Sequence, residues 1–338
     1  MQYMYLVCQS TSYYQNRIFD LSSQNNRDDC YYPFYLLQQR ILEHDMQLNT
    51  YDYLGQDSGY DYKLLFFDVP RDHKYLLKTH QGIAKYLVIF EPEVVSSVAW
   101  NRILHGNFTK VFTWNDALVD NKKYVKLHWP NKIPAGVDIN LKNKTRFCVM
   151  IVGHKSSSHP LELYSERTKA IGWFEQNHPE DFDLYGVGWD KRYFKGALSV
   201  VNRLEFLNKY IKPKYPSYRG TVKSKREVLQ KYKFSICYEN ARDVPGYITE
   251  KIFDCFFAGC VPIYRGASNI AEYIPADTFI DMRNYATYDE LYSYLKSMSA
   301  NEYMAYLVAI KNYVECDKIY PFSAECFADT IINNIEGC

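Results

Sequence analysis

The sequence contains no hydrophobic run long enough to cross a membrane. Its longest wholly apolar stretches, such as FCVMIV at 147–152, have the length of a β-strand. The N-terminus begins MQYMYLVCQS and has no basic residue ahead of its short apolar stretch, so it does not fit the pattern of a signal peptide. We therefore expect no transmembrane segment, and we expect the chain to work in a reducing compartment.

Several motifs that mark common protein classes are also missing. None of the nine cysteines forms a CxxC pair, which argues against a structural zinc site. No GxGxxG, P-loop or GxSxG sequence occurs, so dinucleotide-dependent dehydrogenases, P-loop kinases and serine hydrolases lose support. The 40 basic and 39 acidic residues leave a net charge of +1, which does not suit a nucleic-acid-binding surface.

Short apolar runs alternate with helical patterns along the whole chain. In the first half, the runs at 3–9, 62–70, 85–93 and 110–114 predict strands, and 35–45 predicts a helix. A polar stretch at 128–145, rich in Pro, Gly, Asn and Lys, then reads as a linker between domains. After it the alternation resumes, with strands expected at 146–152, 182–187, 233–239, 261–264 and 278–282, and helices at 161–177, 199–211, 223–231, 249–258, 288–298, 301–314 and 322–335.

This rhythm predicts an α/β fold with two Rossmann-like domains that face each other across a cleft. We expect an N-terminal domain at 1–142, a C-terminal domain at 143–300, and terminal helices at 301–338 that pack back on the N-terminal domain. A cleft between two such domains is the expected place for a ligand.

An acid and a base stand together between two of the most apolar segments of the chain. Glu239 and Asn240 end the expected strand at 233–239, and Thr249 is a good N-cap for the helix that begins with Glu250 and Lys251. Ligands of open α/β sheets bind at the carboxyl ends of strands, and a helix N-terminus attracts anions. The pair therefore indicates a nucleotide-phosphate site, although a solvated lysine and a glutamate that complements the helix dipole would look the same.

The sequence around this pair resembles the signature block of the α1,3/1,4-fucosyltransferases, glycosyltransferase family 10. The resemblance is carried by YKFSICYEN, GYITEKIFDCFFAGCVPIYRGASNIAEYIP and FID, between Tyr232 and Asp281. A softer likeness covers ERTKAIGWFE, FDLYGVGW and the helical end. The resemblance implies a GT-B fold, a GDP-fucose donor held by the C-terminal domain, and inverting transfer without a catalytic metal.

Carried over residue by residue, the resemblance implies that Asn240, Tyr247, Glu250 and Lys251 hold the donor nucleotide and its sugar. Glu239 is a further candidate in the same block. The loop ARDVPG at 241–246 departs from the family spelling, and the chain lacks the repeat tail and basic amphipathic end of some bacterial relatives. We accordingly expect a bacterial-type soluble enzyme of the cytoplasm, with peripheral association at the membrane as the alternative.

A charged residue also lies on an apolar face of the expected helix at 161–177. Arg167 is four residues from both Leu163 and Ile171, so its guanidinium needs an anion, either a carboxylate or a ligand phosphate. The family has an arginine on this helix that contacts the donor diphosphate, and Arg167 matches it. The basic run at 212–226, which includes Lys212, Lys214 and Arg219, is either a second diphosphate clamp or a solvated connection; Arg219 is the candidate within it.

Inverting transfer needs a base for the acceptor hydroxyl group, and a carboxylate is the usual choice. Glu91 and Glu93 stand at the carboxyl end of the strand expected at 85–93, and Pro92 favours an extended conformation of Glu91. Glu91 is the better match to the family's base, with Glu93 as the alternative. The DxD at Asp181 and Asp183 opens a strand instead of following one, so we interpret it as a connection and expect no metal ligands.

Together these features predict a metal-independent, inverting α-1,3-fucosyltransferase that needs no cofactor. It would move L-fucose from GDP-fucose to a hydroxyl of a GlcNAc- or galactose-containing, lactosamine-like oligosaccharide, with Glu91 as base and Arg167 and Lys251 stabilising the departing GDP. One alternative is the same scaffold with another GDP-sugar. The other is a catalytically silent glycan-binding module that uses some of the 33 tyrosines for sugar contacts.

Overall fold

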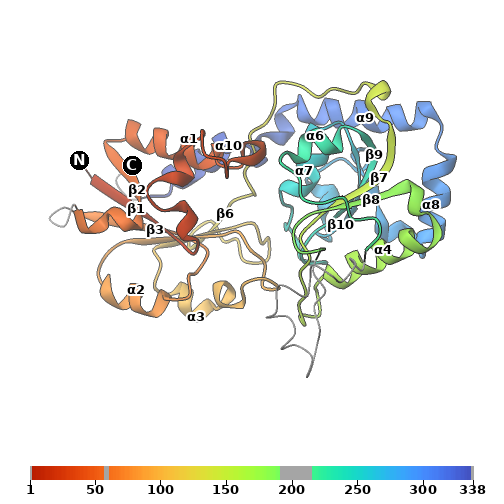
Figure 1. The fold of residues 1–338 in the computed structure, drawn as a ribbon. Helices are drawn as coiled ribbons and strands as arrows, with labels where there is room; N and C mark the ends of the chain where they lie inside the picture. Colours follow the sequence, from red (N-terminus) through yellow and green to blue (C-terminus); the bar gives the residue numbers. More distant parts are fainter. Residues whose placement is uncertain (1, 57–60, 191–214, 336–338) are drawn as a thin grey trace.

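The strands of the protein form two separate parallel sheets, one in each half of the chain (Figure 1). The structure is a computed structural model that describes residues 2–56, 61–190 and 215–335. The helix expected at 199–211, together with Lys212 and Lys214, lies outside the described residues. The two sheets confirm the α/β class and the two Rossmann-like domains predicted from the apolar alternation.

The N-terminal sheet has the strand order β2-β1-β3-β4-β5-β6, and every neighbouring pair is parallel. Leu65 and Phe67 of β3 enter the core on one face, and Leu64 and Phe66 enter the core on the other. Both faces are therefore buried, which explains why these strands are apolar without alternation. The elements are β1 (Gln2–Cys8), α1 (Tyr32–Glu43), β2 (Met46–Thr50), β3 (Tyr62–Phe67), α2 (His73–Thr79), β4 (Lys85–Ile89), α3 (Arg102–His105), β5 (Lys110–Thr113) and β6 (Tyr124–Lys126).

The C-terminal sheet has the order β11-β10-β9-β7-β8 and is also parallel throughout. Its core is filled by aromatic side chains such as Phe174 of the helix before β8 and Phe253 and Phe256 of the helix after β9. The elements are β7 (Arg146–Ile151), α4 (Tyr164–Asn177), β8 (Phe182–Tyr185), α6 (Lys225–Leu229), β9 (Tyr232–Tyr238), α7 (Glu250–Phe257), β10 (Val261–Arg265), β11 (Ile280–Asp281), α8 (Tyr288–Ser297), α9 (Ala300–Val314) and α10 (Ala324–Ile332).

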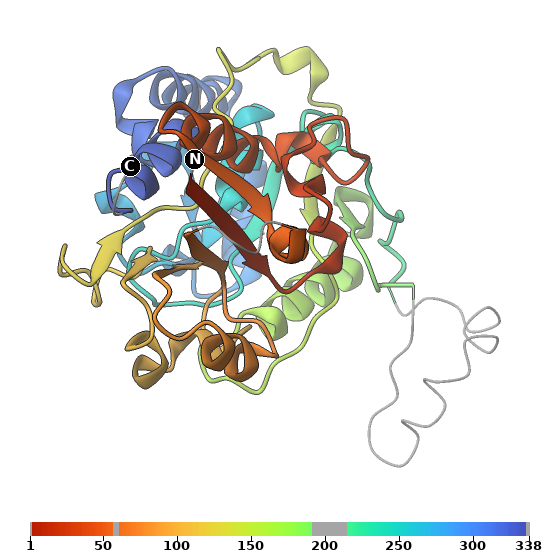
Figure 2. The same ribbon diagram turned by 90° about the vertical axis from the view of Figure 1, so that its left-hand side faces the viewer.

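The last two helices belong to different domains. Leu307 and Ile310 of α9 are part of the C-terminal core, whereas Phe327 and Ile331 of α10 are part of the N-terminal core. Helix α10 packs beside α1 on one face of the N-terminal sheet, and α2 and α3 lie on the opposite face (Figures 1 and 2). Of the segment expected to return to the N-terminal domain, α10 does so and α9 does not.

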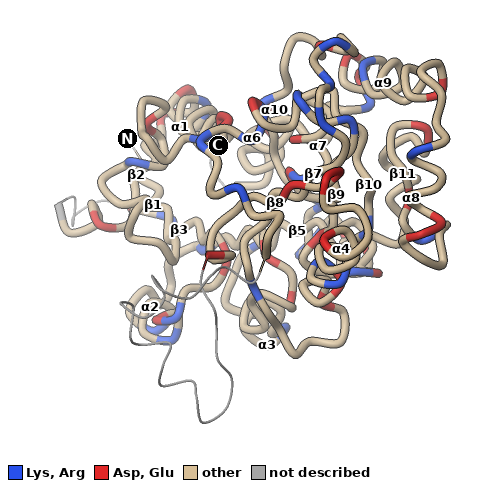
Figure 3. Tube along the Cα trace, turned by 45° about the vertical axis from the view of Figure 1, so that its right-hand side comes forward, with Lys and Arg blue, Asp and Glu red and all other residues tan. Residues whose placement is uncertain are grey.

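The two passages of the chain between the domains are hydrogen-bonded to each other. The backbone N–H of Asn131 donates to the carbonyl of Phe322 at 2.8 Å, and the N–H of Ala324 donates to the carbonyl of Asn131 at 2.8 Å. Basic and acidic residues are interspersed along the trace in both domains (Figure 3). Among the residues described, no helix has both the length and the apolar character needed to span a bilayer.

Replacing Phe327 with Ala should destabilise the N-terminal domain, although residue 327 is near the end of the chain. Phe327 is 1% exposed and contacts the rings of Phe34, Phe67 and Phe90. We expect the free energy of unfolding to fall by about 3–5 kcal/mol in urea titrations, because a cavity remains in the core. The matched control Val308→Ala, at a position 40% exposed on α9, should change it by less than about 0.5 kcal/mol.

Candidate active site

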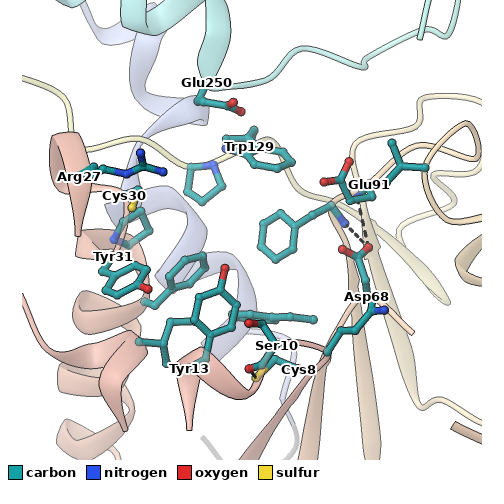
Figure 4. A pocket seen from close by; sticks show the side chains of 18 of the residues that line it. Cys8, Ser10, Tyr13, Arg27, Cys30, Tyr31, Asp68, Glu91, Trp129 and Glu250 are labelled. Carbon is teal, nitrogen blue, oxygen red and sulfur yellow. Dashed lines mark hydrogen bonds between the residues drawn. The ribbon is translucent and has the colours of Figure 1, made fainter. Parts of the chain in front are cut away.

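A cleft of about 1010 Å³ lies between the two domains (Figure 4). Its N-terminal wall comes from residues at and after the carboxyl ends of β1, β3 and β4, including Glu91. Its opposite wall comes from 151–153, 186–187 and 221–225 and from Glu250, Asp254 and Phe257 of α7. This position is the one at which parallel α/β sheets bind ligands, and the volume is sufficient for a ligand of nucleotide-sugar size.

The N-terminus of α7 is built around a fully buried carboxylate. Glu239 follows β9 and accepts hydrogen bonds from the backbone N–H of Thr249 at 2.8 Å and from Nζ of Lys251 at 3.1 Å. Thr249 is the N-cap of α7, as predicted, and its hydroxyl also donates to Glu239. Glu239, a candidate donor contact from the sequence, therefore has its oxygens occupied within the protein and acts by holding Thr249 and Lys251 in place.

Five buried side-chain atoms in the described part of the chain have no hydrogen-bond partner: Glu91 Oε2, His128 Nδ1, Arg167 Nε, Tyr247 Oη and Glu250 Oε2. All but His128 belong to residues that the sequence analysis predicted for the site. Glu91 and Glu250 line the cleft, whereas the other predicted residues Arg167, Asn240, Tyr247 and Lys251 are not among its lining residues. The charges of Glu91 and Glu250 both act on Tyr247, so Tyr247 lies close behind the lining. An unpaired buried polar group costs free energy, so the atoms of Glu91 and Glu250 are suited to a ligand in the cleft.

Arg167 is one of these residues, and it is 3% exposed. Its Nη2 donates to the carbonyl of Tyr238 at 2.7 Å and to Oδ1 of Asn240 at 3.0 Å. None of the ion pairs among the described residues includes Arg167, so the carboxylate partner left open by the sequence is not present. A buried guanidinium with a free donor next to Asn240 is suited to an anionic ligand.

Glu91 and Glu93 have different environments. Glu91 is partly buried at the cleft, and burial raises the pKa of its carboxyl group, against the lowering effect of Lys251, Lys155 and Asn240. The side chain of Glu93 is 59% exposed and has a contact of 3.8 Å with His159. Of the two candidates, Glu91 lines the cleft and Glu93 does not.

Tyr247 and Glu250 are the other two predicted site residues with an unpartnered buried atom. The ring of Tyr247 is buried and packs on Trp114 of the N-terminal domain at 4.6 Å between centroids. Gly246 before it has φ +79°, and a Cβ there would lie 2.2 Å from the carbonyl oxygen of Trp114, so only glycine fits this turn. Although burial raises the pKa of Glu250, the charges of Lys251 and Lys225 outweigh burial, and the net pKa is lowered.

The basic run contributes Lys223 and Lys225 to the cleft lining, and not Arg219, the candidate predicted from the sequence. Arg219 does not line the cleft: its Nε donates to Asp183 at 2.6 Å, and its side chain is 45% exposed. Lys225 does line the cleft; its Nζ contacts Asp254 at 2.7 Å and Glu250 at 3.9 Å. Asp28 of the N-terminal domain accepts the backbone N–H of Lys225 at 2.7 Å, a partner that no local pattern could reveal.

The acidic residues of the DxD are occupied by other side chains. Asp181 accepts hydrogen bonds from Tyr292 and Lys296, and Asp183 accepts them from Arg219 and Tyr232. Across the described ranges, no three His, Cys, Asp or Glu side chains are grouped so that they could hold a metal ion.

Comparisons with known proteins agree with the resemblance. The family model described as "Glycosyltransferase family 10 (fucosyltransferase) C-term" matches residues 142–324, more than half of the chain. An 81-residue segment is 37% identical to the alpha-(1,3)-fucosyltransferase FucT of Helicobacter pylori and covers 24% of this chain and 17% of that protein. A 78-residue segment is 42% identical to human 4-galactosyl-N-acetylglucosaminide 3-alpha-L-fucosyltransferase 9 and covers 22% of this chain and 21% of that protein. A 70-residue segment is 39% identical to an alpha-(1,4)-fucosyltransferase of Arabidopsis thaliana and covers 21% of this chain and 17% of that protein.

The matched segments span only about a fifth of these relatives' own length. Whole-chain likeness comes from solved structures. An α1,3-fucosyltransferase matches with a TM-score of 0.57 at 15% identity, over 98% of this chain and 89% of that one. Anabaena Alr3699/HepE in complex with UDP-glucose matches with a TM-score of 0.56 at 11% identity, over 100% of both chains. At these identities the likeness shows the fold, and it confirms the predicted GT-B arrangement.

Glu239→Gln should destabilise the protein, because the substitution removes the negative charge that pairs with Lys251. The largely buried ammonium group of Lys251 then lacks this partner. We expect the free energy of unfolding to fall by roughly 3 kcal/mol in urea titrations. The control is Glu93→Gln, at the exposed end of β4, which should stay within about 0.5 kcal/mol of the original chain. Equal stabilities of the two variants would contradict the structural role of Glu239.

Proposed function

Because the chain belongs to glycosyltransferase family 10, we propose that it is an inverting α-1,3-fucosyltransferase that moves L-fucose from GDP-fucose to a hydroxyl group of a glycan. The observation that supports this most is the set of unpartnered buried atoms on Glu91, Arg167, Tyr247 and Glu250. They belong to both domains, so they are suited to a donor and an acceptor that meet between the sheets. A structure of an α1,3-fucosyltransferase with GDP-fucose is among the fold neighbours.

In the proposed reaction, Glu91 takes the proton of the acceptor hydroxyl group. The acceptor oxygen then forms a bond to C1 of fucose as the bond from C1 to the diphosphate oxygen breaks, and attack from the opposite face inverts the anomeric carbon. General-base assistance of this kind contributes typically 10²- to 10⁴-fold to the rate. The carboxyl group of Glu91 suits this role because burial raises its pKa, which strengthens it as a base.

Negative charge grows on the departing GDP in the transition state. The guanidinium of Arg167, the ammonium of Lys251 and the N-terminus of α7 are fixed positive groups of the C-terminal domain, and Glu250 at the start of α7 lines the cleft. We propose that they stabilise the leaving group without a divalent metal. Asn240, Tyr247 and Glu250 would orient the donor through their polar atoms. The acceptor would be a lactosamine-like oligosaccharide, and a cytoplasmic location stays a prediction from the sequence.

The test is release of GDP from GDP-fucose in EDTA, with and without N-acetyllactosamine. Release that depends on the acceptor supports the donor, the reaction class and metal independence together. If GDP is released only from another GDP-sugar, the transferred sugar is not fucose. If GDP is released only after Mn²⁺ is added, the reaction is not metal-independent. Binding of the glycan without any affinity for GDP would instead identify a glycan-binding module.

Glu91→Gln should lower kcat by about 10²- to 10⁴-fold, because the amide cannot accept the acceptor's proton. The GDP dissociation constant, measured by calorimetry, should stay within about twofold, since Glu91 is assigned to the acceptor side. The matched control Glu93→Gln should keep kcat, given its exposed side chain. Substantial turnover by Glu91→Gln would remove Glu91 from the role of base.

Lys251→Ala should weaken GDP binding by about 10- to 100-fold, because a charge-assisted hydrogen bond to the diphosphate is lost. The control is Lys169→Ala on α4, whose side chain is 67% exposed. Thermal unfolding should be recorded for both, since Lys251 also pairs with Glu239. Unchanged GDP affinity in a folded Lys251→Ala variant would exclude Lys251 from the donor site.

A further inference from the structure

Asp68 occupies a special place at the end of β3. It follows Phe67 directly and has φ +54°, a left-handed conformation that aspartate tolerates better than most residues. Its own backbone N–H donates to the carbonyl of Val88 at 2.8 Å, so it stays tied to the neighbouring strand β4. The turn directs its side chain across the end of β4 and toward the cleft, which it lines (Figure 4).

The carboxylate of Asp68 holds the backbone that carries Glu91. Its Oδ1 accepts the N–H of Phe90 at 2.9 Å and the N–H of Glu91 at 3.1 Å, as the dashed lines in Figure 4 show. On the other side, Nε1 of Trp100 donates to the carbonyl of Glu91 at 3.0 Å. The main chain of Glu91 is therefore fixed from two directions before its side chain enters the cleft.

The two carboxyl groups are close enough to affect each other's charge. Burial raises the pKa of Asp68 to about 7, with Glu91 adding to the increase and the two amide hydrogen bonds opposing it. Around Glu91, the titratable groups are Tyr13 from the N-terminal loop and Lys155, Tyr164, Tyr247, Glu250 and Lys251 from the C-terminal domain. A charged Glu91 therefore opposes ionisation of Asp68, and Asp68 acts on Glu91 through its hydrogen bonds to the main chain.

We propose that Asp68 is a positioning residue for the transfer reaction, because its side-chain oxygen fixes the main chain that carries Glu91. The inference rests on the proposed role of Glu91 as base. The hydrogen bonds of Asp68 orient Glu91 toward the acceptor hydroxyl group.

Two substitutions test the role of the hydrogen bonds. Asp68→Ala removes the acceptor, and misplacement of Glu91 should lower kcat by about 10- to 100-fold. Asp68→Asn keeps a side-chain oxygen for the two N–H groups, so it should restore kcat to within about threefold of the original. GDP affinity should stay near the original value in both variants, which also reports that they are folded.

The matched control is Asp120→Asn. Asp120 is an exposed carboxylate whose Oδ1 accepts three backbone N–H groups, from Lys122, Lys123 and Tyr124, in a loop outside the cleft lining. It should leave kcat unchanged.

If Asp68→Ala does not fold, Asp68→Glu decides the inference, because its longer side chain moves the accepting oxygen away from the two N–H groups. A kcat within about twofold of the original in a folded Asp68→Ala or Asp68→Glu variant, while Glu91→Gln is inactive, would overturn the role of Asp68 and leave the proposed function standing. Full activity of Glu91→Gln would overturn both, because Asp68 would then have no base to position.

Discussion

The fully buried carboxylate of Glu239 is the constraint on which the donor side of the cleft depends. A charge withdrawn from water at a cost of several kcal/mol must be paired, and the partners available are Thr249 and Lys251 at the start of α7. Their position fixes the helix N-terminus relative to β9. Asn240 follows Glu239 directly and meets Arg167, so the same anchor also sets the position of the guanidinium.

The two domains contribute different chemistry to one space. The N-terminal sheet contributes Glu91 after β4, and the C-terminal sheet contributes the cations after β9. Their separation is set by contacts across the boundary, such as the carboxylate of Asp116, which accepts from Asn269 at 2.9 Å and from Tyr273 at 2.6 Å. Under the proposed function, the base and the groups that stabilise the leaving GDP are held on separate domains, so each set can be rigid while the substrates enter between them.

The fold class and most of the donor cluster could be predicted from the sequence, for physical reasons. Parallel strands with both faces covered are apolar throughout, and the strand end, N-cap and charged pair of the donor site lie within the short segment from Glu239 to Lys251. Residues whose partners are distant could not be found this way. Asp68 and Glu91 are 23 residues apart, and Asp28 and Lys225 are 197 residues apart. The sequence also could not decide whether Arg167 and Arg219 bind a ligand phosphate or have another role, because the answer depends on which carboxylates lie near each guanidinium in space.

The placement of α10 has a consequence for the order in which the chain folds during synthesis. All strands of the N-terminal sheet have been made by Lys126, but α10, which shares one face of this sheet with α1, begins only at Ala324. At typical ribosomal rates of 5–20 residues per second, that interval lasts roughly 10 to 40 s. For that time the part of this face that α10 covers, which includes Phe67 and Phe90, faces water or a chaperone, and the last strand of the C-terminal sheet is made before α10. The domain made first is thus finished last, so its exposed face is where aggregation of the nascent chain should begin.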